Sequence, residues 1–115
     1  MVNPKLPEPE LLKAILEPLL EDFQYWFERS RQLLEKEEID FLEKEEQSDL
    51  LARIKQAQKE VNTSAILFVA TEAKVGIETP VLIQWHKLLT ECWQISARYR
   101  KNSNLFGNGE SKTSN

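Results

Sequence analysis

The stretch LLKAILEPLLEDFQYWFERSRQLLEK, residues 11–36, decides the fold that we expect for this chain. Its apolar residues recur at intervals of three and four, which places them on one face of an α-helix. At about 100° per residue they cover roughly half of the helix circumference. They are Leu12, Ile15, Leu16, Leu19, Leu20, Phe23, Trp26, Phe27, Leu33 and Leu34. We therefore predict one long amphipathic helix over residues 9–36.

Pro18 lies inside this predicted helix. Its ring removes the hydrogen bond to the carbonyl of Ala14 and should kink the helix there. The apolar face stays in phase on both sides of the proline, so we predict one kinked helix and not two helices.

Four aromatic residues fall within five positions of the same stretch, and the helical period divides them. Phe23, Trp26 and Phe27 lie on the apolar face, and we expect them in the core. Tyr25 points about 200° away from Phe23. Tyr25 is therefore predicted to be exposed or to face a partner.

A second helix is predicted over about residues 41–73. Its apolar residues at helical spacing are Leu50, Ile54, Ala57, Val61, Ala65 and Phe68. Asp40 and Glu43, three residues apart, could form a capping box at its start. Gly76 marks the region where this helix should have ended.

A third helix is predicted over about residues 80–101, with Thr79 as N-cap and Pro80 at its first position. Its apolar face comprises Val81, Leu82, Trp85, Leu88, Leu89, Cys92, Trp93, Ser96 and Tyr99. Three amphipathic helices with short links favour an all-α fold, an antiparallel three-helix bundle. We expect one domain over residues 9–101, an extended lead-in over 1–8 and a disordered polar tail over 102–115.

Composition excludes several classes of protein. The chain has 115 residues and a net charge of −4, and its pI of about 5.1 argues against a general nucleic-acid binder. Its longest apolar run, residues 65–70, is far shorter than the roughly 20 residues of a transmembrane helix. No signal-peptide core is visible, and the single cysteine excludes an internal disulfide. We expect a soluble cytoplasmic protein.

Residues that could carry chemistry do not converge in the sequence. His86 and Cys92 lie about 240° apart on one helix and cannot share a metal ion from it. The chain lacks the CxxC, HExxH and glycine-rich phosphate-loop patterns. We place Cys92 in the core and His86 at its edge beside Trp93. We predict a protein that is not an enzyme and has no metal ion or cofactor.

Two charged segments leave alternatives open. Residues 35–46 hold seven acids and two lysines, and they are either a solvated connection or a site for a cation or an electropositive partner. The basic stretch RYRK, residues 98–101, complements the dipole of the third helix, and it could also touch anionic lipid or an acidic partner.

Three apolar residues miss the faces of their helices: Ile66, Leu67 and Ile83. If they meet across the second and third helices, they form an interface. With Tyr25, they are the candidate partner-facing residues, for either a homodimer or a foreign protein.

The segments LPEPELLKAILEPLLEDFQYWFERSRQLLE, DLLARIKQAQKEV and WHKLLTECWQISARYR resemble an uncharacterised family of small cyanobacterial proteins, a domain of unknown function. The resemblance covers about residues 6–100 and carries no known site residues. It implies a cyanobacterial cell interior, either the cytosol or the cytoplasmic face of the thylakoid. We expect a non-enzymatic protein-interaction module, an assembly, scaffold or regulatory factor. The alternative is a peripheral thylakoid-membrane or pigment-associated protein.

Overall fold

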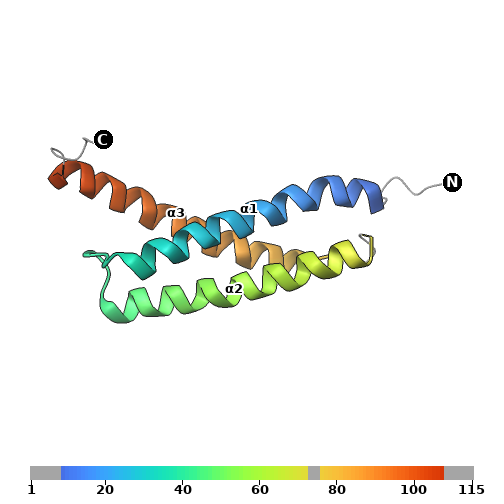
Figure 1. Cartoon of the computed structure of the whole chain (residues 1–115), viewed down its shortest axis with the longest axis horizontal. Coiled ribbons are helices and arrows are strands. Elements are labelled where there is room, and N and C mark those ends of the chain that lie inside the picture. The colour runs from blue at the N-terminus through green and yellow to red at the C-terminus, as the bar shows by residue number, and fades with distance from the viewer. Residues whose placement is uncertain (1–8, 73–75, 108–115) are drawn as a thin grey trace.

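Three α-helices form the fold in a computed structural model that describes residues 9–72 and 76–107. They are α1 (Pro9–Lys36), α2 (Lys44–Ala70) and α3 (Thr79–Gly107). Helix α2 runs antiparallel to α1, and α3 runs back along the pair (Figure 1). The predicted all-α three-helix bundle is confirmed. The predicted lead-in over residues 1–8 and the part of the predicted tail over 108–115 lie outside the described residues.

Helices α1 and α3 cross near the middle of the molecule and diverge toward both ends (Figure 1). The C-terminal end of α3 points away from the other two helices, and the first turns of α1 leave α3 at the opposite end. Helix α1 has 28 residues, and at 1.5 Å per residue it spans about 42 Å. The longest dimension of the molecule is 63 Å. The divergence therefore makes the bundle elongated and leaves part of α1 without cover from α3.

The core lies where the three helices meet. Phe23 and Phe27 of α1 stack with ring centroids 5.9 Å apart, and Trp85 of α3 meets Phe23 edge to face at 5.6 Å. All the core residues predicted for α2 are buried except Ala65, which packs partly buried against the core. The buried apolar residues are Leu16, Leu20, Phe23, Phe27, Leu34, Ile39, Leu50, Ile54, Ala57, Val61, Phe68, Trp85, Leu89 and Cys92.

Several residues of the predicted apolar faces are not fully buried, and three of them are large side chains of special interest. Ile15 is 55% exposed, Trp93 is 41% exposed, and Trp26 is only partly buried. Trp26 and Trp93 meet across α1 and α3 with ring centroids 5.9 Å apart, but this contact leaves part of each ring uncovered. Periodicity correctly gave these faces an apolar character, but it could not show how much of each side chain a neighbouring helix would cover.

Helix α1 runs without interruption through Pro18, whose side chain is exposed. One helix over residues 9–36 is therefore confirmed. The kink at Pro18 stays a prediction.

The start of α2 corrects the predicted cap. The helix begins at Lys44 and not at residue 41, and its N-cap is Glu43 and not Asp40. The backbone N–H of Glu43 donates to the carboxylate of Glu46 at 2.9 Å. Ile39 is buried, and the N–H of Leu42 donates to its carbonyl at 3.0 Å. This turn occupies the residues that were expected to begin the helix.

Gln47 holds the connection between α1 and α2. Its amide nitrogen donates to the carbonyls of Leu34 and Glu37, at 2.9 and 2.8 Å. Its amide oxygen accepts from the backbone N–H of Ile39 at 3.0 Å. One side chain thus satisfies three backbone groups at the end of α1 and in the turn that follows it.

The connection between α2 and α3 differs from the prediction at both ends. Helix α2 ends at Ala70 rather than residue 73, and Glu72, not Gly76, has a left-handed backbone, with φ 54°. The carbonyl of Glu78 accepts from the N–H groups of Val81 and Leu82, so the cap of α3 lies one residue before the predicted Thr79.

Helix α3 continues to Gly107, whereas the sequence predicted an end at 101 and a disordered tail from residue 102. Residues 102–106 are NSNLF, which contains neither proline nor glycine. A helix that has already formed extends at little cost per residue. Polar composition alone was therefore a poor sign of its end.

Candidate functional site

The four predicted partner-facing residues are all exposed: Tyr25, Ile66, Leu67 and Ile83. Tyr25 lies in the middle of α1, whereas Ile66 and Leu67 lie near the end of α2, and Ile83 lies near the start of α3. The structure thus separates Tyr25 from the other three. That any of them faces a partner stays a prediction.

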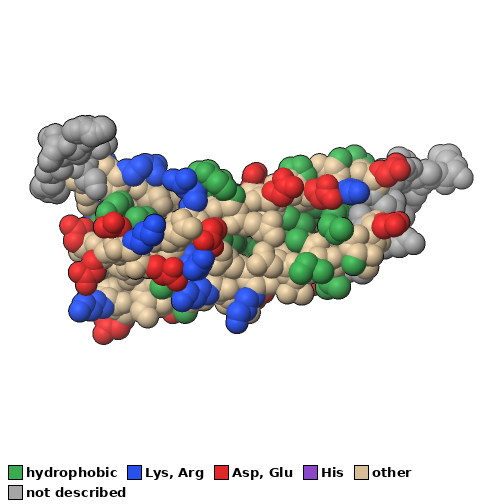
Figure 2. Space-filling view, viewed as in Figure 1, with side chains coloured by type: hydrophobic (Ala, Val, Ile, Leu, Met, Phe, Trp, Pro, Cys, Tyr) green, Lys and Arg blue, Asp and Glu red, His purple; other side chains and the backbone are tan. Residues whose placement is uncertain are grey.

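Exposed apolar side chains gather at one end of the molecule, which we call the apolar end. Its members are Leu11, Ile15, Ile66, Leu67, Val69 and Ile83. Figure 2 shows most of the visible hydrophobic side chains, with acidic ones among them, over the end formed by the N-terminal part of α1 and the C-terminal part of α2, and mostly Lys, Arg, Asp and Glu over the opposite end. Scattered exposed apolar residues are common on proteins, but a group of this kind marks a candidate contact surface.

Tyr25 belongs to a run of aromatic rings that joins α1 to α3. Its ring meets that of Trp26 edge to face, with centroids 5.0 Å apart. The Trp26 ring meets that of Trp93 in the same way at 5.9 Å. Three rings therefore form a continuous, partly exposed surface across two helices.

A groove of about 410 Å³ lies beside these rings, between α1 and the diverging half of α3. We call it the aromatic groove. Its lining residues are Trp26, Arg29, Ser30, Leu33, Trp93, Ser96, Ala97, Tyr99 and Arg100. Two arginines and no carboxylate line it, although the chain carries 19 acids against 15 basic residues.

Arg29, which lines this groove, and Arg98 of α3 each contact an aromatic ring. The Arg29 guanidinium lies 5.6 Å from the Tyr25 ring centroid and 5.9 Å from that of Trp26, and it donates to the Tyr25 hydroxyl at 3.2 Å. Arg98 lies 4.2 Å above the Phe41 ring. Within residues 9–72 and 76–107, neither these two arginines nor Arg100 forms an ion pair with a carboxylate.

The remaining arginines are each held by two carboxylates. Arg31 pairs with Glu28 at 2.6 Å and with Glu35 at 3.0 Å. Arg53 pairs with Asp49 at 3.1 Å and with Glu91 at 3.0 Å. These pairs neutralise both guanidinium groups within the chain.

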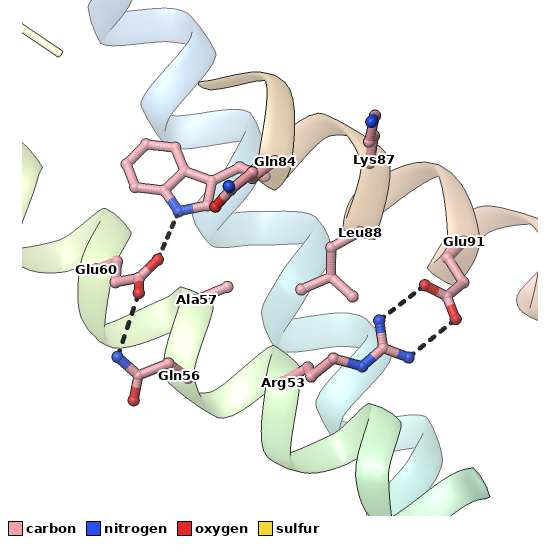
Figure 3. A pocket seen from close by; sticks show the side chains of 9 residues that line it. Arg53, Gln56, Ala57, Glu60, Gln84, Lys87, Leu88 and Glu91 are labelled. Carbon is pink, nitrogen blue, oxygen red and sulfur yellow. Dashed lines mark hydrogen bonds and ion pairs between the residues drawn. The ribbon is translucent and has the colours of Figure 1, made fainter. Parts of the chain in front are cut away.

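A second groove, of about 290 Å³, lies between α2 and α3, and its polar groups satisfy one another (Figure 3). Both terminal nitrogens of Arg53 donate to the carboxylate of Glu91 at 3.0 Å. The indole N–H of Trp85 donates to Glu60 at 3.0 Å, and the amide of Gln56 donates to the other oxygen of Glu60 at 3.2 Å. This groove holds α3 against α2 and offers few unsatisfied groups to a ligand.

Cys92 is buried in the core, as predicted. Burial raises the pKa of its thiol to about 11, although the hydroxyl of Ser30 opposes that rise. The thiol is therefore protonated at neutral pH and unsuited to act as a nucleophile. His86 is exposed and not at the edge of the core, which corrects its predicted place. The described residues contain no group of three or more metal-ligating side chains.

Side chains of the acidic segment over residues 35–46 contact residues elsewhere in the chain. Glu35 pairs with Arg31 and, at 3.5 Å, with Lys55. Glu37 accepts a hydrogen bond from the Tyr99 hydroxyl at 3.1 Å. These contacts tie the segment to all three helices, which gives part of its charge a structural role.

No helix in the part of the chain that the structure describes is long and apolar enough to cross a membrane. This agrees with the prediction from the length of the apolar runs.

A family model described as a protein of unknown function, DUF2605, matches residues 6–101. The chain belongs to this family. The match spans nearly all of the three helices, so the resemblance to a domain of unknown function is confirmed. Neither the curated proteins nor the solved structures include a match to this DUF2605 chain.

The sequence identified Tyr25 in this DUF2605 chain as exposed, but it did not reveal the aromatic groove beside it. Trp26 and Trp93 were assigned to the core because their faces are apolar. The arginine pattern did hold a signal, since Arg31 has acids three residues before it and four after it. Arg29 has none at those spacings.

Proposed function

We propose that this protein is a non-enzymatic helical interaction module that acts as an assembly, scaffold or regulatory factor. The aromatic groove is its main partner-binding surface. The observation that carries the proposal is the exposed face of Trp93, which packs on Trp26 and is flanked by Arg29 and Arg100, both without carboxylate partners among the described residues.

The residue types in the groove support this proposal. Tryptophan, tyrosine and arginine are enriched among the few residues that contribute most of the binding energy at protein interfaces. Arginine stacked on a ring keeps its in-plane N–H groups available for a carboxylate. A partner that offers apolar side chains together with carboxylates would complement both features.

The arrangement of potential catalytic groups also favours a binding role. Cys92 is buried with a protonated thiol, and His86 lies exposed on the same helix. The polar groups between α2 and α3 are bound to one another. None of these arrangements brings a nucleophile and a base together.

The apolar end is a second candidate contact surface within the same proposal. Ile66 is 68% exposed there, and Leu67 and Ile83 are each nearly half exposed. Its chemistry differs from that of the groove because its exposed apolar members are aliphatic. The two surfaces can be tested separately.

Affinity purification of the tagged full chain from its native host, followed by mass spectrometry, tests the proposal. Trp93→Ala and Arg29→Ala should each lose the captured protein, whether it is a foreign partner or an untagged copy. Lys87→Ala, on the groove between α2 and α3, is the control and should retain it. The same purification with an Ile66→Ala variant tests the apolar end, because loss of a captured protein there would assign its binding to that surface. If both groove variants retain every captured protein, the groove is not the binding surface.

A second candidate function is peripheral contact with a membrane, on the cytoplasmic face of the cyanobacterial thylakoid, or association with a pigment. Trp93, Arg98 and Arg100 lie in the half of α3 that diverges from the bundle, and they combine an aromatic ring with cationic groups. Flotation with vesicles of anionic lipid tests the membrane contact, and an absorption spectrum of the protein from its host tests for pigment. Absence of flotation and of a bound chromophore would exclude this candidate.

A further inference from the structure

Asp22 and Arg29 of α1 carry opposite charges and lie on either side of the aromatic pair formed by exposed Tyr25 and partly buried Trp26. They are seven residues apart, which on an α-helix places them almost in line and about 10 Å apart. Both side chains are exposed. In the described part of the chain, neither forms an ion pair.

Helix spacing explains why neither Asp22 nor Arg29 has an ion-pair partner within α1. The residues three and four positions from Asp22 are Pro18, Leu19, Tyr25 and Trp26, none of which is a cation. Those around Arg29 are Tyr25, Trp26, Gln32 and Leu33, none of which is a carboxylate. Because side chains pair along a helix mainly at these spacings, α1 itself supplies neither group with a partner.

We propose that this face of α1 binds a second copy of the chain, with the two α1 helices antiparallel about a two-fold axis between Tyr25 and Trp26. The inference rests on the proposed interaction function and names its partner. In a two-fold interface each residue pair occurs twice. Asp22 of one copy then lies opposite Arg29 of the other, and the aromatic pairs meet at the centre.

The charge order selects this arrangement over its alternatives. A parallel pairing of the same faces would place Asp22 against Asp22 and Arg29 against Arg29, which is repulsive. A symmetric antiparallel pairing neutralises all four charges. The pattern is thus self-complementary, which a site for a wholly acidic foreign partner would not need.

Apolar groups along the same face fit the antiparallel register. Counting outward from the axis, Pro18 comes opposite Leu33, which is partly buried and lines the aromatic groove. Ile15, 55% exposed, comes opposite Lys36, whose aliphatic stem can cover it. The exposure of Ile15 is then reduced in the pair.

Charge reversal in the full chain tests the pairing by sedimentation velocity over a wide range of protein concentration. The wild type should form a dimer as its concentration rises. Asp22→Arg and Arg29→Asp should each raise the dissociation constant at least about tenfold, because each places like charges opposite one another twice. Circular dichroism should show that both variants keep the helical content of the wild type.

Mixing the two variants provides the decisive measurement. The Asp22→Arg chain carries two cations on this face and the Arg29→Asp chain carries two anions, so an equimolar mixture should form a heterodimer. The double variant should form a homodimer again. Glu21→Arg is the matched control, since it makes the same charge change one position away and off this face, and it should leave the dimer intact.

Three results would overturn the pairing: a wild type that stays monomeric at every concentration, a mixture that fails to associate, or a Glu21→Arg variant as weak as Asp22→Arg. A monomeric wild type that still captures a foreign protein through Trp93 would overturn the self-association and leave the proposed function standing. A wild type that neither self-associates nor captures a foreign protein through Trp93 would overturn both the pairing and the proposed function.

Discussion

Helix α1 contacts a different kind of surface on each of its two sides. Toward α2, its polar side chains are matched within the chain: Glu28 accepts from Arg31, Gln32 and Gln58, and Gln24 donates to Asn62 at 2.9 Å. Toward α3, beyond the shared core, it presents rings and an arginine that has no carboxylate within the described residues.

This difference between the α1–α2 and α1–α3 seams indicates that one specifies the fold and the other is available for binding. A seam whose polar groups satisfy one another specifies how two helices pack, because any other register would leave those groups unpaired. A seam that leaves a tryptophan exposed and an arginine without a carboxylate adds less to the fold and retains the capacity to bind. The α1–α2 seam is accordingly the structural one, and the α1–α3 seam is the candidate for function.

The largest effect is expected in the core that both seams share. Phe27 is fully buried, and Phe27→Ala should lower the free energy of unfolding by about 3–5 kcal/mol, because it removes a buried ring and leaves a cavity. Urea unfolding followed by circular dichroism measures this loss. A loss below that of the Trp93→Ala variant would reverse the assignment of core and surface.

An intermediate effect, which depends on pH, is expected in the α1–α2 seam. The hydrogen bond from Arg31, followed by that from Gln58, lowers the pKa of Glu28 from 4.5 to about 2. The ionised carboxylate is therefore favoured by folding, and its contribution is fully present above pH 4.5 and lost as the pH falls toward 2. Glu28→Gln should be less stable than the wild type at neutral pH, with a difference that shrinks across this window.

Urea unfolding between neutral pH and pH 2 checks the Glu28 prediction. Glu21→Gln is the control, because Glu21 is exposed on the same helix and forms no ion pair among the described residues. Its pH profile should follow that of the wild type. A difference between Glu28→Gln and the wild type that stays constant with pH would show that the seam is not held by this carboxylate.

The smallest effect on stability is expected in the α1–α3 seam. Trp93 is 41% exposed and packs edge to face on Trp26, so Trp93→Ala, which loses the ring pair and the buried part of the indole, should lower the free energy of unfolding by about 2 kcal/mol, less than Phe27→Ala. The same urea titration measures it. A loss as large as that of Phe27→Ala would mean that the groove is closed in solution and that the contrast between the seams is false.

Periodicity predicted the helices well because burial is itself periodic. Ile54, Val61 and Phe68 recur at intervals of seven, and each is at most 1% exposed. Periodicity failed for Ile15 and Trp93 because it reports that a face is apolar, and not whether another helix covers that face. The divergence of α1 from α3 arises from packing between distant parts of the chain, which short-range patterns do not encode.

The local ends of the helices were harder to predict for a different reason. Asp40 and Glu43 both fit a cap, and the choice between them depends on the burial of Ile39 and on Gln47, eight residues further along. Such contacts become visible only once the two helices lie side by side. The arginine contrast was accessible from sequence, since Arg29 and Arg31 differ in the acids at helical spacing around them.

The hydrogen bonds of Gln47 have a consequence for how the surface of this protein can vary. The connection over residues 37–43 contains neither glycine nor proline, and Asp40 is its one residue of a type common in turns. The path of the connection is shaped by an amide on the following helix. The exposed side chains of Glu38 and Asp40 take no part in the hydrogen bonds of Gln47. The electrostatic potential at this end of the molecule can be retuned by substitution while the path of the backbone stays the same.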